Sequence, residues 1–123
     1  MEITTQEIHN VELITVRGRV DSVEAPGLAK ALEAASRRGK HKIVVDMNGV
    51  EYMSSAGFRA LGDAQRNSQR HQGGKVVLAQ VPALIHEALE TVGFTEYFHI
   101  EDSVEAALAF AENLPAGDST SGD

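Results

Sequence analysis

With 123 residues, 42% of them hydrophobic, the chain is long enough to form one domain with a hydrophobic core. Its 18 acidic and 11 basic residues give a formal net charge of −7, which disfavours nucleic-acid binding because that binding depends on Lys and Arg placed against phosphates. The sequence has no cysteine, which excludes disulfide bonds and thiolate chemistry.

A β-hairpin is predicted at the start of the chain. Its strands cover residues 2–9 and 11–19, and Asn10 marks the tight turn between them. In the second strand the apolar residues mostly keep strand spacing, and Thr15 adds β-propensity.

The first helix is predicted at Ala25–Arg38. Asp21 and Ser22 precede it and offer the side-chain oxygens of an N-cap, and Pro26 fits its first turn. Gly39 fits the position that ends a helix. The apolar face of this helix consists of Leu28, Ala31, Leu32 and Ala35.

A central strand is predicted at His41–Met47. Its three consecutive β-branched residues, 43–45, indicate burial on both faces, as in a parallel sheet covered by helices. A short turn containing Ser54 and Ser55 leads from this strand into a second helix, Ala56–His71, which Gly73 and Gly74 end.

The remaining elements continue the alternation of strands and helices. A strand is predicted at Lys75–Gln80. Pro82 opens the next helix, which Gly93 stops and whose apolar residues are Leu84, Ile85, Ala88 and Leu89. A short strand at Glu96–Ile100 and a last helix, capped by Asp102 and Ser103 and ending near Asn113, complete the order. Residues 114–123 have no apolar periodicity and are predicted to be a disordered acidic tail, so the folded domain covers residues 1–113. This order of elements predicts an α/β fold with a mixed sheet.

The sequence lacks the spacings that metal, nucleotide and membrane sites require. No two histidines among His9, His41, His71, His86 and His99 are four residues apart, and no zinc ligand set is clustered. Gly74-Lys75 lacks the following Ser or Thr and the first Gly of a phosphate-binding loop. No stretch approaches the roughly 18 apolar residues of a membrane span, and the polar N-terminus is unlike a signal peptide. We therefore expect a cytoplasmic protein without a metal or a cofactor.

The serine turn has three interpretations. Ser55 lies at or near a first helical turn, where backbone N–H groups lack intrahelical partners, so its hydroxyl either caps the helix or is presented as a phosphate acceptor. The turn also invites comparison with the nucleophile elbow G-x-S-x-G of hydrolases. Gly57 matches the second glycine of that motif, but Met53 occupies the position of the first. We expect no catalytic residue and no enzyme activity.

Several segments resemble a known family. Residues Asp46–Leu61, DMNGVEYMSSAGFRAL, look like the signature of STAS domains, and the closest type is the bacterial anti-sigma factor antagonist. Val16–Asp21 (VRGRVD) resembles the family's strand end before the first helix, and Gly73–Leu78 (GGKVVL) and Val92–Phe94 extend the similarity to roughly residues 2–112. The resemblance implies a STAS-like mixed sheet of four to five strands with helices packed on one side.

The resemblance also implies a function. Members of this family bind an anti-sigma factor serine kinase and so release a sigma factor; the kinase inactivates them by phosphorylating one serine, and a metal-dependent serine/threonine phosphatase reverses this. The phosphoacceptor lies two residues before the glycine of the signature, which is Ser55 relative to Gly57. The implied partner-binding residues are Asp21, Ser54, Ser55, Ala56 and Gly57. The chain departs from the family pattern at Ser54, which is often Asp, and at Ala56, which is often Ser or Thr.

Two alternatives to this function stay open. Some STAS proteins are not phosphorylated and serve as scaffolds or as subunits of lipid transporters. Asp21 is equally well explained as the N-cap of the first helix.

Overall fold

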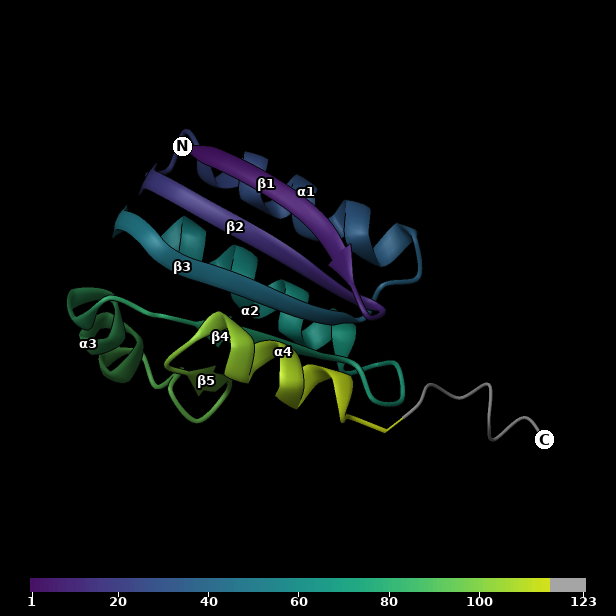
Figure 1. Cartoon of the computed structure of the whole chain (residues 1–123). Helices are drawn as coiled ribbons and strands as arrows, with labels where there is room; N and C mark the ends of the chain where they lie inside the picture. Colours follow the sequence, from purple (N-terminus) through teal and green to yellow (C-terminus); the bar gives the residue numbers. More distant parts are fainter. Residues whose placement is uncertain (116–123) are drawn as a thin grey trace.

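Within residues 1–115, which the computed structural model describes, the chain forms a five-stranded sheet with the order β1-β2-β3-β4-β5 and four helices (Figure 1). The strands are β1 (Glu2–Ile8), β2 (Val11–Val20), β3 (Lys42–Met53), β4 (Lys75–Ala79) and β5 (His99–Glu101). The helices are α1 (Ala25–Arg37), α2 (Ser55–Ser68), α3 (Ala83–Thr91) and α4 (Val104–Glu112). Strand β1 is antiparallel to β2 and all other pairs are parallel, so the predicted mixed α/β sheet is confirmed.

The turn and the helix ends that were predicted from Asn10, Gly39 and Gly93 are confirmed. His9 and Asn10 have φ values of 50° and 68°, the left-handed conformation that a two-residue hairpin turn requires. Gly39 and Gly93 have φ values of 80° and 79° and follow the ends of α1 and α3, where a residue with a side chain would be strained.

Strand β3 is longer than predicted, because it continues through Met47 to Met53. Its pairing with β2 shifts twice: Thr15 pairs with Asp46 but Arg17 pairs with Gly49, and Gly18 pairs with Val50 but Arg19 pairs with Tyr52. These β-bulges interrupt the alternation of inward and outward side chains, so the second half of the strand has no regular pattern in the sequence. The extension carries the chain directly to Ser54.

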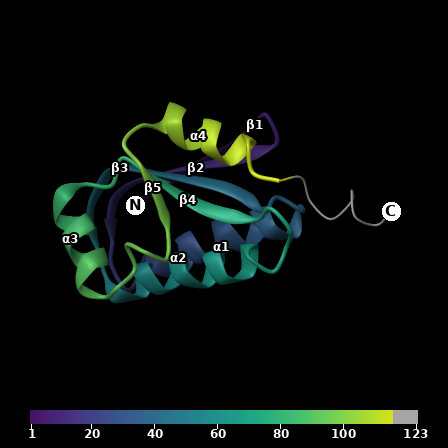
Figure 2. The same cartoon turned by 90° about the horizontal axis from the view of Figure 1, so that it is seen from below.

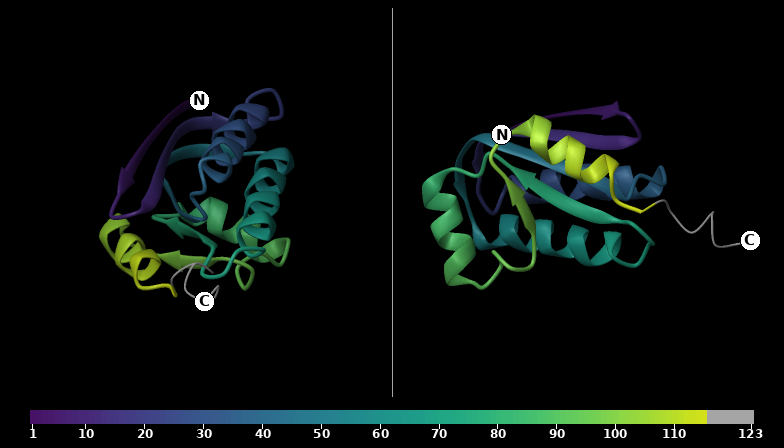
Figure 3. Two further views of the ribbon diagram at one scale, coloured as in Figure 1. Left: turned by 90° about the vertical axis from the view of Figure 1, so that its right-hand side faces the viewer. Right: turned by 60° about the horizontal axis from the view of Figure 1, so that its bottom comes forward.

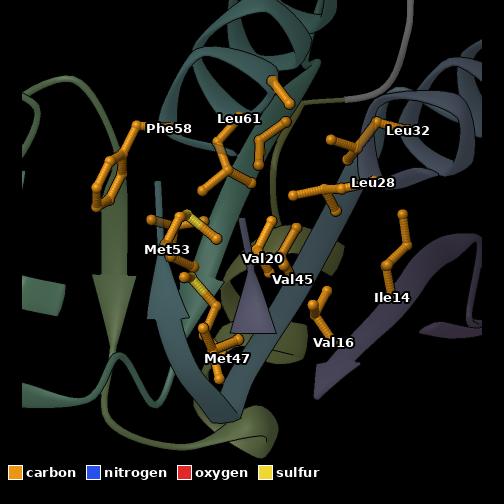
Figure 4. Close-up of a cluster of buried hydrophobic side chains, with 14 of the residues drawn as sticks. Ile14, Val16, Val20, Leu28, Leu32, Val45, Met47, Met53, Phe58 and Leu61 are labelled. Atoms are coloured by element: carbon orange, nitrogen blue, oxygen red, sulfur yellow. The ribbon is translucent and has the colours of Figure 1, made fainter. Parts of the chain in front are cut away.

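The main core lies between one face of the sheet and helices α1 and α2, and α3 lies at one end of it (Figure 2). Leu28 and Leu32 of α1 and Leu61 of α2 point toward the sheet, where they meet the side chains of β2 and β3 (Figure 4). Ile85 and Leu89 of α3 belong to the same cluster. Leu84, which the sequence groups with them at helical spacing, does not, because it is 78% exposed.

Helix α4 lies on the opposite face of the sheet, so the expectation that all helices pack on one side needs correction (Figure 2). Its Ala107 and Ala111 are fully buried in a second cluster with Val11, Val44 and Val77 of the strands. Two small side chains let the helix lie close to the sheet. The predicted burial of the central strand on both faces is confirmed, because Ile43 and Val45 belong to the main core and Val44 to the second cluster.

The C-terminal end of α4 is tied to the start of β3. Nζ of Lys42 donates a 3.0 Å hydrogen bond to the carbonyl oxygen of Leu114, and the Leu114 side chain packs against the second cluster. Leu114 was assigned to the tail, and the structure instead places it in contact with the folded domain. The rest of the predicted tail, residues 116–123, lies outside the described residues.

Candidate functional site

The candidate site lies at the edge of the sheet where β2 and β3 end. Val20 pairs with Met53, and the N–H of Ser54 donates a 2.8 Å hydrogen bond to the carbonyl oxygen of Val20. Asp21 and Ser54 each follow one of these paired residues directly. The structure therefore brings the Asp21 loop and the serine turn together at one edge.

Ser54 caps helix α2. Its backbone is extended (φ −79°, ψ 169°), and its Oγ accepts a hydrogen bond from the N–H of Gly57 at 3.3 Å. The N–H of Phe58 donates to the carbonyl oxygen of Ser54 at 3.1 Å, which begins the helical pattern. The cap role that the sequence left open for Ser55 therefore belongs to Ser54.

Ser55 is the first residue of α2, and its side chain is exposed. Its hydroxyl makes no hydrogen bond to any residue in the described part of the chain. The hydroxyl is thus presented to solvent from a turn that its neighbour holds in place.

Gly57 allows the first turn of α2 to lie directly on the strand ends. A Cβ atom on this residue would be 2.6 Å from Cγ of Met53, a distance that real Cβ atoms essentially never show, and 3.1 Å from a methyl carbon of Val20, which is also tight. The adjacent Ala56 is half-buried against the main core. Small residues at positions 56 and 57 therefore fix how far Ser55 stands above the sheet.

Asp21 supports the loop that precedes α1. Its Oδ1 accepts hydrogen bonds from the N–H groups of Val23 at 3.1 Å and Glu24 at 2.9 Å, and its carbonyl oxygen accepts from Ala25 at 2.9 Å. The predicted N-cap of this helix is therefore wrong: the N-cap position of α1 is Glu24, which makes no side-chain cap hydrogen bond, and Asp21 instead holds the turn that precedes the helix. The side chain is half-buried beside the serine turn.

A groove of about 810 Å³ begins at Ser55 and runs between α2 and the loop that joins α3 to β5. Phe58 of α2 and Phe94 and Tyr97 of the loop line it. The Phe94 and Tyr97 rings lie 5.7 Å apart, and Phe94 also approaches Gly62 of α2, where a Cβ would be 3.4 Å from the ring. This groove was not predicted, because its two walls are distant in the sequence.

Gln65 fixes the distance between the two walls of the groove. This side chain is fully buried; its Nε2 donates to the carbonyl oxygen of Tyr97 at 2.7 Å, and its Oε1 accepts from the N–H of Val76 at 2.8 Å. One amide thus joins α2 to the start of β4 and to the loop before β5. In the sequence, the signal for this contact was a polar residue, Gln65, at a position on the apolar face of the predicted helix.

Four large apolar side chains are exposed among the described residues, and all of them lie at the Ser55 end of the molecule: Val23, Tyr52, Leu84 and Val92. Val23 follows the end of β2 and is 81% exposed, Leu84 follows the end of β4, and Val92 lines the groove.

The described residues contain no group of three His, Asp or Glu side chains that would hold a metal ion. No helix in residues 1–115 is long and apolar enough to cross a membrane.

A scan of protein families matches the STAS domain to residues 2–107. The chain belongs to the STAS domain family. This STAS domain is 31% identical over 116 residues to BtrV of Bordetella bronchiseptica, a protein assigned as an anti-sigma factor antagonist; the match covers 94% of this chain and 99% of BtrV. The family resemblance that the signature at Asp46–Leu61 indicated is therefore confirmed.

Solved structures confirm the STAS fold. A protein of Thermotoga maritima, also assigned as an anti-sigma factor antagonist, superimposes with a TM-score of 0.83 at 14% identity, covering 90% of this chain and 95% of that one. The Bacillus cell-fate determinant SpoIIAA in its phosphorylated form gives a TM-score of 0.71 at 14% identity, covering 89% of this chain and 98% of SpoIIAA.

Proposed function

We propose that this STAS domain is an anti-sigma factor antagonist: it binds an anti-sigma factor serine kinase through the Ser55 edge, and phosphorylation of Ser55 releases the kinase. Its similarity to BtrV supports the antagonist role. A metal-dependent serine/threonine phosphatase removes the phosphate, as the family resemblance implies. The partner surface consists of Asp21, Ser54, Ser55, Ala56 and Gly57.

The division of roles between the two serines carries this proposal. Ser54 makes the cap, so Ser55 has an exposed hydroxyl without a structural duty in the described part of the chain. An acceptor must enter a kinase active site, and an exposed side chain at the start of a helix meets that need without unfolding. The departure at Ser54 from the Asp that the family often has leaves the cap intact, because both residues cap helices well.

The physical effect of a phosphate differs between the free domain and the complex. The group adds about −1.5 to −2 charges at pH 7, and the first turn of α2 tolerates negative charge because its N–H groups carry partial positive charge. In a complex the same group brings charge and bulk into a surface shaped for a hydroxyl. A loss of about 3 kcal/mol in binding free energy weakens a complex on the order of a hundredfold.

The test uses the wild-type protein with Ser55→Ala, Ser55→Asp and Ser54→Ala. Each is incubated with ATP and each anti-sigma factor kinase encoded near its gene, the phosphate is mapped by mass spectrometry, and kinase affinity is measured by calorimetry. We expect label on Ser55 only, binding by Ser55→Ala without label, and weaker binding by Ser55→Asp.

Other outcomes identify the alternatives. Label on Ser54 alone moves the switch by one residue. Label on neither serine, with Ser55→Asp binding as tightly as wild type, overturns the phosphorylation switch and favours an unphosphorylated scaffold or a lipid-transporter subunit. Turnover of an ester probe that Ser55→Ala abolishes identifies a hydrolase.

A further inference from the structure

Arg59 lies one helical turn after Ser55 on α2, and both side chains line the same groove. Residues four apart on a helix have Cβ atoms about 5–6 Å from each other, which is less than the length of an extended Arg side chain. The guanidinium of Arg59 and any group attached to Ser55 Oγ are therefore within reach of one another.

Arg59 is exposed and forms no ion pair with another residue in positions 1–115. The acidic residue one turn further along the helix, Asp63, is paired instead with Arg66. Although the formal charge of the chain is −7, the guanidinium of Arg59, close to the candidate phosphate acceptor Ser55, has no carboxylate partner among the described residues. This charge is therefore accessible to an external or newly attached anion.

We propose that Arg59 recognises negative charge in both states of the switch, an inference that rests on the proposed function. In the unphosphorylated domain Arg59 binds a carboxylate on a segment of the kinase that enters the groove. In the phosphorylated domain the phosphoryl group on Ser55 binds the same guanidinium. Arginine holds carboxylates and phosphates with paired hydrogen bonds, and the attached phosphate has the advantage of being part of the same molecule.

The walls of the groove define the chemistry of the kinase segment. Phe58, Phe94 and Tyr97 supply an apolar floor, and the exposed Val92 extends it at the rim. Arg59 supplies the unpaired positive charge at the Ser55 end. The matching segment carries an apolar side chain next to an acidic one.

The phosphorylated half of the proposal is tested without the kinase. Phosphoserine is incorporated at position 55 of the wild-type, Arg59→Gln and Arg70→Gln proteins, and the phosphate is titrated by ³¹P NMR. A guanidinium beside the phosphate stabilises its doubly charged form, so we expect the phosphate of the wild type to titrate at lower pH than that of Arg59→Gln. All three proteins share the other charged groups near the phosphate, so the effects of these groups on its pKa cancel in this comparison. These groups are the helix terminus, Asp21, Glu24 and Asp63. Arg70→Gln, which removes an exposed arginine after the end of α2 and outside the groove lining, should titrate like the wild type.

The binding half is measured with the kinase and the unphosphorylated proteins. Arg59→Gln should lose on the order of tenfold in affinity, Arg59→Lys less, and Arg70→Gln little, as expected for removal of a charge at an interface rim. Circular dichroism verifies that each variant is folded. Equal titration of wild type and Arg59→Gln, or equal kinase affinity, overturns the proposal.

The two proposals fail in different ways. If the wild type neither binds the kinase nor accepts phosphate, the proposed function is wrong, whatever Arg59→Gln does. If the wild type binds and switches but Arg59→Gln behaves identically, the function stands and the role of Arg59 is wrong.

Discussion

The N–H of Ser54 donates a 2.8 Å hydrogen bond to the carbonyl oxygen of Val20, and this bond joins the ends of β2 and β3 at the residue that caps α2. Asp21 follows Val20 and holds the next loop by accepting two backbone hydrogen bonds. The loop with exposed Val23 and the turn with exposed Ser55 are thus parts of one rigid edge. A partner that contacts both meets a preformed surface.

Replacing the capping serine should weaken the domain. We expect Ser54→Ala to lower the free energy of unfolding by about 1 kcal/mol, because the N–H of Gly57 loses its acceptor. Urea denaturation measures the change. Ser54→Asp is the matched control and should remain near wild-type stability, since Asp caps helices equally well; if it loses as much as Ser54→Ala, the cap explanation is incorrect.

A methyl group at Gly57 should disturb the site. Gly57→Ala places a carbon 2.6 Å from Cγ of Met53, so we expect a loss of about 1–3 kcal/mol from overpacking and reduced phosphorylation of Ser55. Gly62→Ala is the control on the same helix, because its new Cβ would meet Phe94 at the ordinary contact distance of 3.4 Å. Thermal unfolding that does not separate the two variants would contradict this prediction.

Gln65 should be important for both stability and the groove. Gln65→Leu leaves the N–H of Val76 and the carbonyl oxygen of Tyr97 without their partner, at a cost of about 1–3 kcal/mol for each buried group. We expect a clear fall in the urea midpoint and faster hydrogen exchange in residues 94–98. The exposed Gln69 in the turn after α2 provides a control, and Gln69→Leu should change neither quantity. Wild-type exchange in Gln65→Leu would show that other contacts hold the loop.

A charge in the centre of β3 should prevent folding. Val44 is fully buried beneath α4, so Val44→Asp buries a carboxylate without a partner and should cost several kcal/mol, a large part of the stability of a small domain. Val44→Ala is the milder comparison, which removes volume without adding charge. A melting temperature of Val44→Asp within a few degrees of wild type would contradict the burial of this residue.

Local signals in the sequence predicted most of the elements. Asn10, Gly39, Gly93 and Ser103 act through their own backbone conformation or side-chain oxygen, and each has the predicted role in the structure. The parallel arrangement of β3 followed from its β-branched residues. These features depend on neighbours in the chain, which is why a single sequence suffices for them.

The features that were missed depend on contacts between distant segments. Asp46, Asn48 and Gly49 are unfavourable in strands, so the second half of β3 was not recognised where bulges accommodate them. The face on which α4 packs cannot be derived from its own apolar residues. The groove also requires Gln65 to meet Tyr97 across 32 positions. The role of Ser54 as the cap was ambiguous because either of two adjacent serines fits that position.

The bond from Lys42 to Leu114 determines where the chain leaves the domain. Lys42 begins β3 and Ser54 follows its other end, so the last described residues lie at the far side of the molecule from α3 and the serine edge (Figure 3). Residue 1, in contrast, lies near the Asp21 loop, with its amino group 3.9 Å from Glu24. If the serine edge binds the kinase as proposed, a biosensor tether or fluorescent protein attached at the C-terminal side leaves that edge unobstructed, whereas one attached before Met1 competes for that space.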